Sequence, residues 1–103
     1  MKYCSVYITA GDEKEAGRIG RALVEEKLAA CVNILPVKSI YRWEEDVEEE
    51  AEAVMFVKTQ QELTDKVIDR VKALHSYDVP CIVSFTIEKG DSEYLDWIGE
   101  STG

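Results

Sequence analysis

The feature that most limits the fold is a stretch of extended sequence that is long for a chain of 103 residues. Residues 30–43 lack a helical period and contain many β-branched and aromatic side chains, which predicts one long strand. A strand of about 14 residues at roughly 3.3 Å each is about 45 Å long, whereas a domain of this size has a radius of gyration of about 13 Å. The strand must therefore project beyond the globule. Its alternation is lost at Leu35 and Pro36, where we expect a β-bulge.

The projecting strand has a partner that completes a hairpin. Residues 53–59 form a second strand pattern, which we expect to begin inside the acidic run of residues 44–52. Tyr41 and Trp43 lie near the projecting end, where large aromatic side chains usually serve as interface anchors. We therefore expect another subunit to receive them. The acidic run lacks the loop motif of a calcium site, so we interpret it as a solvated end that deters unwanted strand pairing, with weak ion binding as the alternative.

The segments on either side of the hairpin follow helical and strand patterns. Residues 3–9 and 81–88 have strand character, and Asp12 followed by Glu15 has the form of a helix start. This first helix is expected to end near residue 28. Thr59 followed by Glu62 resembles a second capping box, which predicts a helix whose apolar face repeats at helical spacing through Leu63, Val67, Val71 and Leu74.

A short terminal helix completes the order of elements. Asp91 or Ser92 can cap this helix, and Tyr94, Leu95 and Ile98 share one of its faces. The resulting βαββαβ order with an added helix predicts an α+β fold of the ferredoxin-like sandwich type, in a single domain that spans residues 1–103. In this fold both main helices cover one face of an antiparallel sheet, and the other face lacks a cover.

Composition and charge exclude several classes of partner. Hydrophobic residues make up 46% of the chain and charged residues 32%, which is normal for a folded domain. A net charge of -9 disfavours nucleic acid, because the phosphate backbone repels it. No apolar stretch is long enough for a membrane span and no signal segment opens the chain, so we expect a cytoplasmic protein. Cysteines occur singly, without disulfide or zinc spacing, at Cys4, Cys31 and Cys81.

Five segments give the chain a resemblance to a known family. The segments LAACVNILP, SIYRWE, Lys58 with Thr59, HSYDVP and YLDWI occur in order along nearly the whole sequence. Together they resemble the CutA divalent-cation tolerance family. The resemblance implies a ferredoxin-like homotrimer in which each long hairpin pairs with a neighbouring subunit. It also implies a role in tolerance to divalent metals, with copper binding and without catalysis.

The sequence departs from the common family pattern where a metal site is concerned. Cys81 replaces a carboxylate in the later motif, whereas Asp78 keeps one. The resemblance places three proposed copper ligands of some bacterial members at Ile8, Leu74 and His75. Only one of these three residues, the histidine, can ligate a metal. No cofactor is therefore expected to be obligatory, and a divalent metal such as copper is the expected ligand.

His75 is the best metal candidate, because it is the only histidine and imidazole is a common ligand of copper and zinc. Asp78 lies close enough in sequence to join it, and Cys81 is a candidate third ligand, as are Cys31 and a residue of another subunit. The alternative is that His75 interacts with the carbonyl groups at the end of its helix. An enzyme that uses His75, Tyr77 and Asp78 is a third hypothesis, but no catalytic motif accompanies them, so we expect no enzymatic activity.

A separate hypothesis concerns a cleft between subunits. Arg42, Lys58 and Tyr77, together with Asp78, could gather there and bind a small anionic ligand. Hydrogen bonding across the interface is the alternative role for these side chains. A ligand in such a cleft would make the protein a signalling or scaffold trimer that resembles the PII-type proteins. The sequence leaves both roles open.

Overall fold

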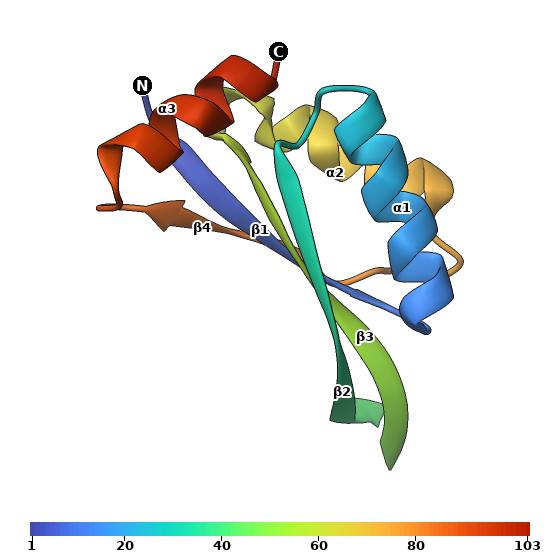
Figure 1. The fold of residues 1–103 in the computed structure, drawn as a ribbon. Helices are drawn as coiled ribbons and strands as arrows, with labels where there is room; N and C mark the ends of the chain where they lie inside the picture. The colour runs from blue at the N-terminus through green and yellow to red at the C-terminus, as the bar shows by residue number, and fades with distance from the viewer.

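The computed structural model describes residues 1–103 and contains one four-stranded antiparallel sheet with three α-helices (Figure 1). The sheet order is β2-β3-β1-β4, which confirms the predicted ferredoxin-like α+β arrangement. No helix has both the length and the apolar character needed to cross a membrane. In chain order the elements are β1 (Tyr3–Ala10), α1 (Glu13–Glu25), β2 (Cys31–Trp43), β3 (Asp46–Gln60), a short 3-10 helix (Gln61–Leu63), α2 (Thr64–Leu74), β4 (Ile82–Ile87) and α3 (Ser92–Ser101).

The core lies between the sheet and the pair of helices α1 and α2. Side chains alternate along β1, so that Val6 and Ile8 point toward the helices and are fully buried. They meet Met55 of β3 and the apolar faces of the helices, represented by Ile19 of α1 and Val71 of α2. This face of the sheet is therefore closed by residues of the same chain.

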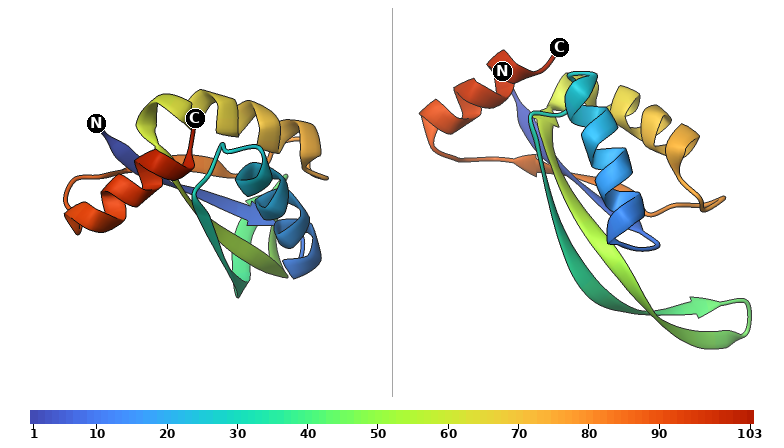
Figure 2. Two further views of the ribbon diagram at one scale, coloured as in Figure 1. Left: turned by 45° about the horizontal axis from the view of Figure 1, so that its top comes forward. Right: turned by 45° about the vertical axis from the view of Figure 1, so that its right-hand side comes forward.

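The opposite face of the sheet is largely open. Phe56 of β3 and Phe85 of β4 remain 36% and 60% exposed, and the ring of Tyr7 packs edge-on against Phe56 with 5.7 Å between the ring centroids. Only one end of this face is covered, where α3 lies against β3 and Gly99 of α3 approaches Tyr3 of β1 (Figure 2). There Gln60 donates from Nε2 to the carbonyl oxygens of Gly99 and Thr102, each at 3.2 Å.

The hairpin of β2 and β3 projects from the globule and curves (Figure 2). It accounts for a molecule that measures 45 × 25 × 21 Å along its principal axes, which confirms the predicted overhang. β1 pairs with β3 only as far as Ala10 opposite Ala53, so residues 46–52 have β2 as their only strand neighbour. We call residues 37–52 the free hairpin.

The β-bulge expected at Leu35 and Pro36 is absent, and that prediction is wrong. Pairing between β2 and β3 runs in one unbroken register from Cys31 opposite Lys58 to Trp43 opposite Asp46. Pro36 is tolerated because β2 is an edge strand, where alternate N–H groups point away from the sheet.

The predicted helix starts are partly confirmed. Asp12 caps α1 by accepting a hydrogen bond from the Glu15 backbone N–H at 2.8 Å, and Asp91 caps α3 in the same way. The capping box at Thr59 is wrong, because Thr59 lies in β3 and donates its buried hydroxyl to the Leu28 carbonyl oxygen at 2.6 Å. α2 begins later, at Thr64. The pairing of β3 with β1 continues to Gln60, and these ladder bonds prevail over the local helical pattern.

Candidate functional site

The largest concave feature is a groove between the free hairpin and the body of the protein. Its volume is about 850 Å³. Three parts of the chain line it: strand β1, the inner side of the hairpin and the loop between α2 and β4. The groove continues the open face of the sheet, because Tyr7 and Thr9 of β1 belong to both. The lining residues are Tyr7, Thr9, Ser39, Ile40, Tyr41, Trp43, Glu48, Glu50, Glu52, Tyr77, Asp78, Val79 and Cys81.

The charge of the groove is negative. Three hairpin glutamates and Asp78 line it, and no lysine or arginine does. Indole and phenol rings lie among these carboxylates, contributed by Trp43, Tyr41 and Tyr77. Carboxylates next to aromatic faces favour cationic ligands over anionic ones.

The residues predicted for an anion-binding cleft do not meet within one chain. Tyr77 lines the groove, but Lys58 is paired with Cys31 and Ser5 near the far end of the sheet, where its ammonium donates to the Asn33 side chain. Arg42 lies close to the hairpin turn, and strand alternation directs it to the side opposite Tyr41 and Trp43. A cleft that contains all of these residues would need more than one chain.

The three residues predicted to bind metal lie on the same loop and its exit. Asp78 and Cys81 are exposed and line the groove. The His75 side chain is fully buried, and both of its ring nitrogens have partners. No group of three or more histidine, cysteine, aspartate or glutamate side chains is arranged to hold a metal ion. In this arrangement His75 does not fit a metal site.

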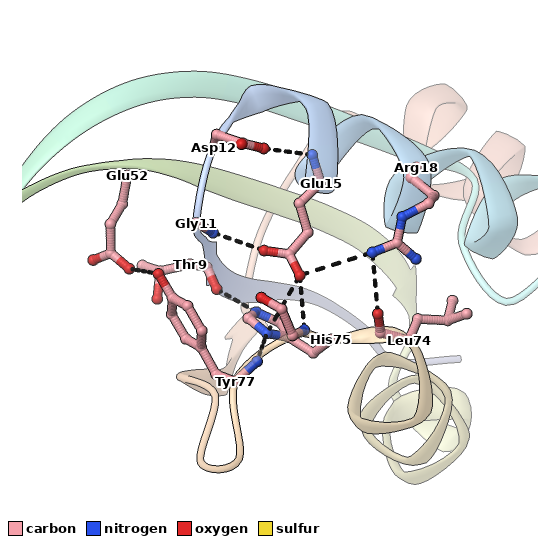
Figure 3. Close-up of polar contacts among 10 residues, drawn as sticks. Thr9, Gly11, Asp12, Glu15, Arg18, Glu52, Leu74, His75 and Tyr77 are labelled. Atoms are coloured by element: carbon pink, nitrogen blue, oxygen red, sulfur yellow. Dashed lines mark hydrogen bonds and ion pairs between the residues drawn. The ribbon is translucent and has the colours of Figure 1, made fainter.

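The hydrogen bonds of His75 define its chemical form (Figure 3). Nε2 lies 2.8 Å from the Thr9 carbonyl oxygen, which can only accept, so Nε2 carries the proton. The Tyr77 backbone N–H donates to Nδ1 at 3.0 Å, so Nδ1 is unprotonated. The ring is therefore neutral. Neither nitrogen is free for a substrate or a metal.

Glu15 holds the same loop from the side of helix α1 (Figure 3). Its Oε1 accepts from the Gly11 N–H at 2.9 Å, and its Oε2 accepts from the Ser76 N–H at 2.7 Å. Burial alone would raise the pKa of Glu15, but the hydrogen bonds from Ser76 and Gly11 outweigh it and hold this pKa below its usual range. The carboxylate is thus charged at neutral pH and joins the start of α1 to the loop.

Tyr77 extends this network into the groove. Its phenol donates to Glu52 Oε2 at 2.7 Å, and its ring tilts against His75 with 4.7 Å between centroids. Burial and the adjacent Glu52 carboxylate raise the pKa of Tyr77 above its usual range, so the phenol remains a donor. Sequence patterns did not single out Glu15 or Glu52 for these roles. Glu15 matched a helix start and Glu52 was one of several carboxylates in an acidic run, so no signal marked either one.

Near the covered end of the open face lies a separate thiol environment that the sequence did not predict. Cys31 Sγ lies 4.0 Å from the Lys58 ammonium and 3.9 Å from the Asn33 carboxamide oxygen. Burial and the nearby Cys31 side chain raise the pKa of Tyr94. Register brings these β2 and β3 residues together, and α3 supplies the tyrosine.

Taken together, fold and groove define a class of small ferredoxin-like α+β proteins with a long projecting hairpin and an open sheet face. Comparison with known proteins identifies the family. The family model described as CutA1 divalent ion tolerance protein matches residues 4–101. The chain therefore belongs to the CutA1 divalent ion tolerance family, and the predicted resemblance is confirmed.

Individual relatives agree with this assignment over the full domain. The divalent-cation tolerance protein CutA of Archaeoglobus fulgidus is 52% identical over 96 residues, which cover 93% of this chain and 94% of the relative. The CutA protein of Thermus thermophilus is 52% identical over 99 residues, or 95% of this chain and 96% of the relative. A solved structure of the Archaeoglobus protein, described as periplasmic, superimposes with a TM-score of 0.95 at 50% identity and covers 96% of this chain and 97% of that one.

Proposed function

We propose that this protein is a non-catalytic homotrimer that binds divalent metal ions such as copper and acts in divalent-cation tolerance. The observation that supports this proposal best is the open face of the sheet, where Phe56 and Phe85 stay exposed and Tyr7 leads into the groove. Phe85 and Trp43 are 60% and 61% exposed at its two ends. Apolar surface of this extent, rimmed by polar side chains, is typical of interfaces between proteins.

The hairpin gives the proposed assembly its geometry. β2 is an edge strand with an exposed outer side, and Tyr41 and Trp43 project from the part that overhangs the globule. A second copy that packs against this side would bury these rings and complete strand pairing at the edge. Three copies related by a threefold axis would form a closed ring, because the hairpin of each chain would pack against one neighbour and each chain would contact the hairpin of the other.

The metal would bind in the groove and not at the His75 ring. Asp78 supplies a carboxylate and Cys81 a thiol, and both face the carboxylates of the hairpin across the groove. Oxygen and sulfur donors of this kind suit divalent transition metals. Because one chain does not gather three such ligands, residues of a neighbouring copy would complete the site.

Sedimentation velocity tests the assembly. The wild-type protein is expected to sediment as a particle of about three times the chain mass of 11.7 kDa at micromolar concentration. A well-folded monomer under these conditions would contradict the proposal, and with it the interpretation of the open face as an interface.

Copper titration by calorimetry tests the metal site in the assembled protein. Asp78→Asn and Cys81→Ser are each expected to weaken Cu(II) binding about tenfold or more, because each removes a ligand. Asp69→Asn, on the exposed side of α2, is the matched control for loss of a carboxylate. His75→Asn is expected to weaken binding less than either ligand variant, because His75 positions the loop while both of its ring nitrogens are occupied. Equal affinity in all these variants would place the metal elsewhere, and a loss confined to His75→Asn would restore the histidine site.

A second candidate function is suggested by the size of the groove. A volume of about 850 Å³ lies in the range of small-molecule sites. A trimer that binds a metabolite at the boundary between subunits would resemble the PII-type signalling proteins. Thermal shifts that respond to small organic molecules and ignore metals would favour this function over metal binding.

We also propose a cytoplasmic location, in line with the unpaired state of all three cysteines. The Archaeoglobus relative is described as periplasmic, so the two expectations differ. Fractionation of cells that express the tagged native chain would decide between them, and recovery outside the cytoplasm would contradict the proposal.

A further inference from the structure

The contact between Tyr77 and Glu52 occupies a special position in the fold. Glu52 is the first residue of β3 beyond the pairing with β1, which ends at Ala53. From this point outward the hairpin has no strand of the body beside it. The hydrogen bond from the Tyr77 phenol to Glu52, at 2.7 Å, is the only hydrogen bond or ion pair between side chains of the free hairpin and the rest of the chain.

The loop that carries Tyr77 is held from two independent directions (Figure 3). His75 fastens it to the end of β1 through the Thr9 carbonyl oxygen and accepts the Tyr77 N–H. Glu15 fastens it to the start of α1 through the N–H groups of Gly11 and Ser76. Strand β1 and helix α1 together therefore fix the position of the Tyr77 phenol. Ordering a loop costs conformational entropy, which these hydrogen bonds offset while they fix the position of the phenol.

We propose that Tyr77 is a strap that sets the angle at which the free hairpin leaves the body, and that His75 and Glu15 are positioning residues for this strap. The Tyr77–Glu52 hydrogen bond lies where the sheet narrows to the two strands of the hairpin. A small change in strand direction at this point therefore moves the far end of the hairpin by a larger distance. This role accounts for the two hydrogen bonds of His75, which use both ring nitrogens to hold the loop. Its effect on assembly rests on the proposed trimer, whereas its effect on the hairpin does not.

Hydrogen exchange followed by mass spectrometry tests the strap directly. In Tyr77→Phe, which removes only the phenolic hydroxyl, amides of residues 46–52 are expected to exchange on the order of tenfold faster, while those of α1 and β1 keep their rates. Tyr7→Phe is the matched control, because Tyr7 lines the same groove and its hydroxyl has no hydrogen-bond partner in the chain. Unchanged exchange in Tyr77→Phe would overturn the proposal.

Conservative variants separate the strap from a general loss of stability. Glu52→Gln keeps an acceptor for the phenol and is expected to exchange nearly as slowly as the wild type, whereas Glu52→Ala is expected to match Tyr77→Phe. His75→Asn can still accept the Tyr77 N–H, and is expected to retain more protection in the hairpin than His75→Gln. The same protection in Glu52→Gln and Glu52→Ala would contradict a role for the hydrogen bond.

The dissociation constant of the assembly supplies the second readout. Tyr77→Phe is expected to raise it on the order of tenfold, and Tyr7→Phe is expected to raise it less. If the wild-type chain is a monomer, the proposed trimer fails, but the exchange experiment still decides whether the strap exists. If the chain is a trimer and Tyr77→Phe changes neither exchange nor assembly, the strap fails and the trimer stands.

Discussion

The globular half of the molecule and the free hairpin differ in where their apolar side chains find cover. In the globular half, Ile8 and Ile19 are fully buried among residues of the same chain. In the free hairpin no side chain is buried, and Ile40, Trp43 and Val47 are between 61% and 65% exposed. One chain is therefore sufficient to cover the apolar residues of the core, whereas it leaves those of the hairpin exposed.

The largest effect should come from the core. Ile8→Ala is expected to lower the free energy of unfolding by about 3 kcal/mol, because it removes buried methylene groups and leaves a cavity. Denaturant titration at several protein concentrations measures this loss. Ile40→Ala removes the same atoms from the hairpin and serves as the control. A loss for Ile40→Ala that is equally large and independent of concentration would break the comparison, whereas a loss that vanishes on dilution would show that another copy covers Ile40.

The next largest effect should come from the end of the hairpin. Trp43→Ala is expected to raise the dissociation constant of the assembly on the order of 30-fold, because exposed aromatic anchors supply much of the energy at interfaces. Sedimentation across a dilution series measures the change, and circular dichroism at low concentration should show an unchanged fold. Trp43→Phe keeps an aromatic ring and should lose less. An unchanged dissociation constant in Trp43→Ala would show that the hairpin end is not covered.

A smaller effect is expected on stability at acid pH, through the hydrogen-bond network that joins the two regions. The pKa of Glu15 is lower in the folded chain than its ordinary value of 4.5, so its contribution to stability is complete above that value and is lost as the pH falls below it. Glu15→Gln should therefore be less stable than the wild type at pH 7, and the difference should shrink as the pH falls below about 4.5. Thermal melts between pH 3 and pH 7 measure it.

Glu13→Gln is the control for Glu15→Gln, since Glu13 lies in the same first turn and forms none of these hydrogen bonds. Its difference from the wild type should be small and should depend less on pH. The same pH dependence in both variants would assign the effect to the charge at the helix end and not to the bonds with the loop.

The smallest effect should come from the surface of the globular half. Arg70 of α2 makes a two-pronged ion pair with Glu26 at 2.9 Å, but both side chains remain about two-fifths exposed. Water and salt screen such pairs. Arg70→Lys is therefore expected to melt within error of the wild type at physiological salt. A loss of melting temperature as large as that of Glu15→Gln would show that this ion pair holds α1 and α2 together as strongly as the hydrogen bonds of Glu15 hold α1 to the loop.

Much of the fold could be predicted because its signals are local. Strand character, helix caps at Asp12 and Asp91 and the overhang of the hairpin depend on residues that are close in sequence. The same locality produced the wrong start for α2 at Thr59, where four residues resembled a capping box but Thr59 and Gln60 pair with β1 instead. The expected bulge at Pro36 failed for a related reason, because an edge strand tolerates proline in a regular register.

The candidate site was only partly predictable. Tyr41, Trp43, Tyr77, Asp78 and Cys81 line one groove, although the sequence assigned them to three separate sites, namely a subunit interface, a ligand cleft and a metal site. Lys58 and Arg42 lie away from it, because strand register and alternation assign them other places. The carboxylates that make the groove negative come from the acidic run, which the sequence described as a solvated hairpin end with weak ion binding as the alternative.

By itself, the sequence determined the order of strands and helices, the faces that form the core, the overhang of the hairpin and the family. Only the tertiary structure decided that Glu15, His75, Tyr77 and Glu52 form one network and that the histidine has no free nitrogen. The physical reason is the separation along the sequence between the residues that interact. Propensity and periodicity act over a few residues, whereas hydrogen bonds between residues 25 to 66 positions apart depend on how the sheet and helices pack together.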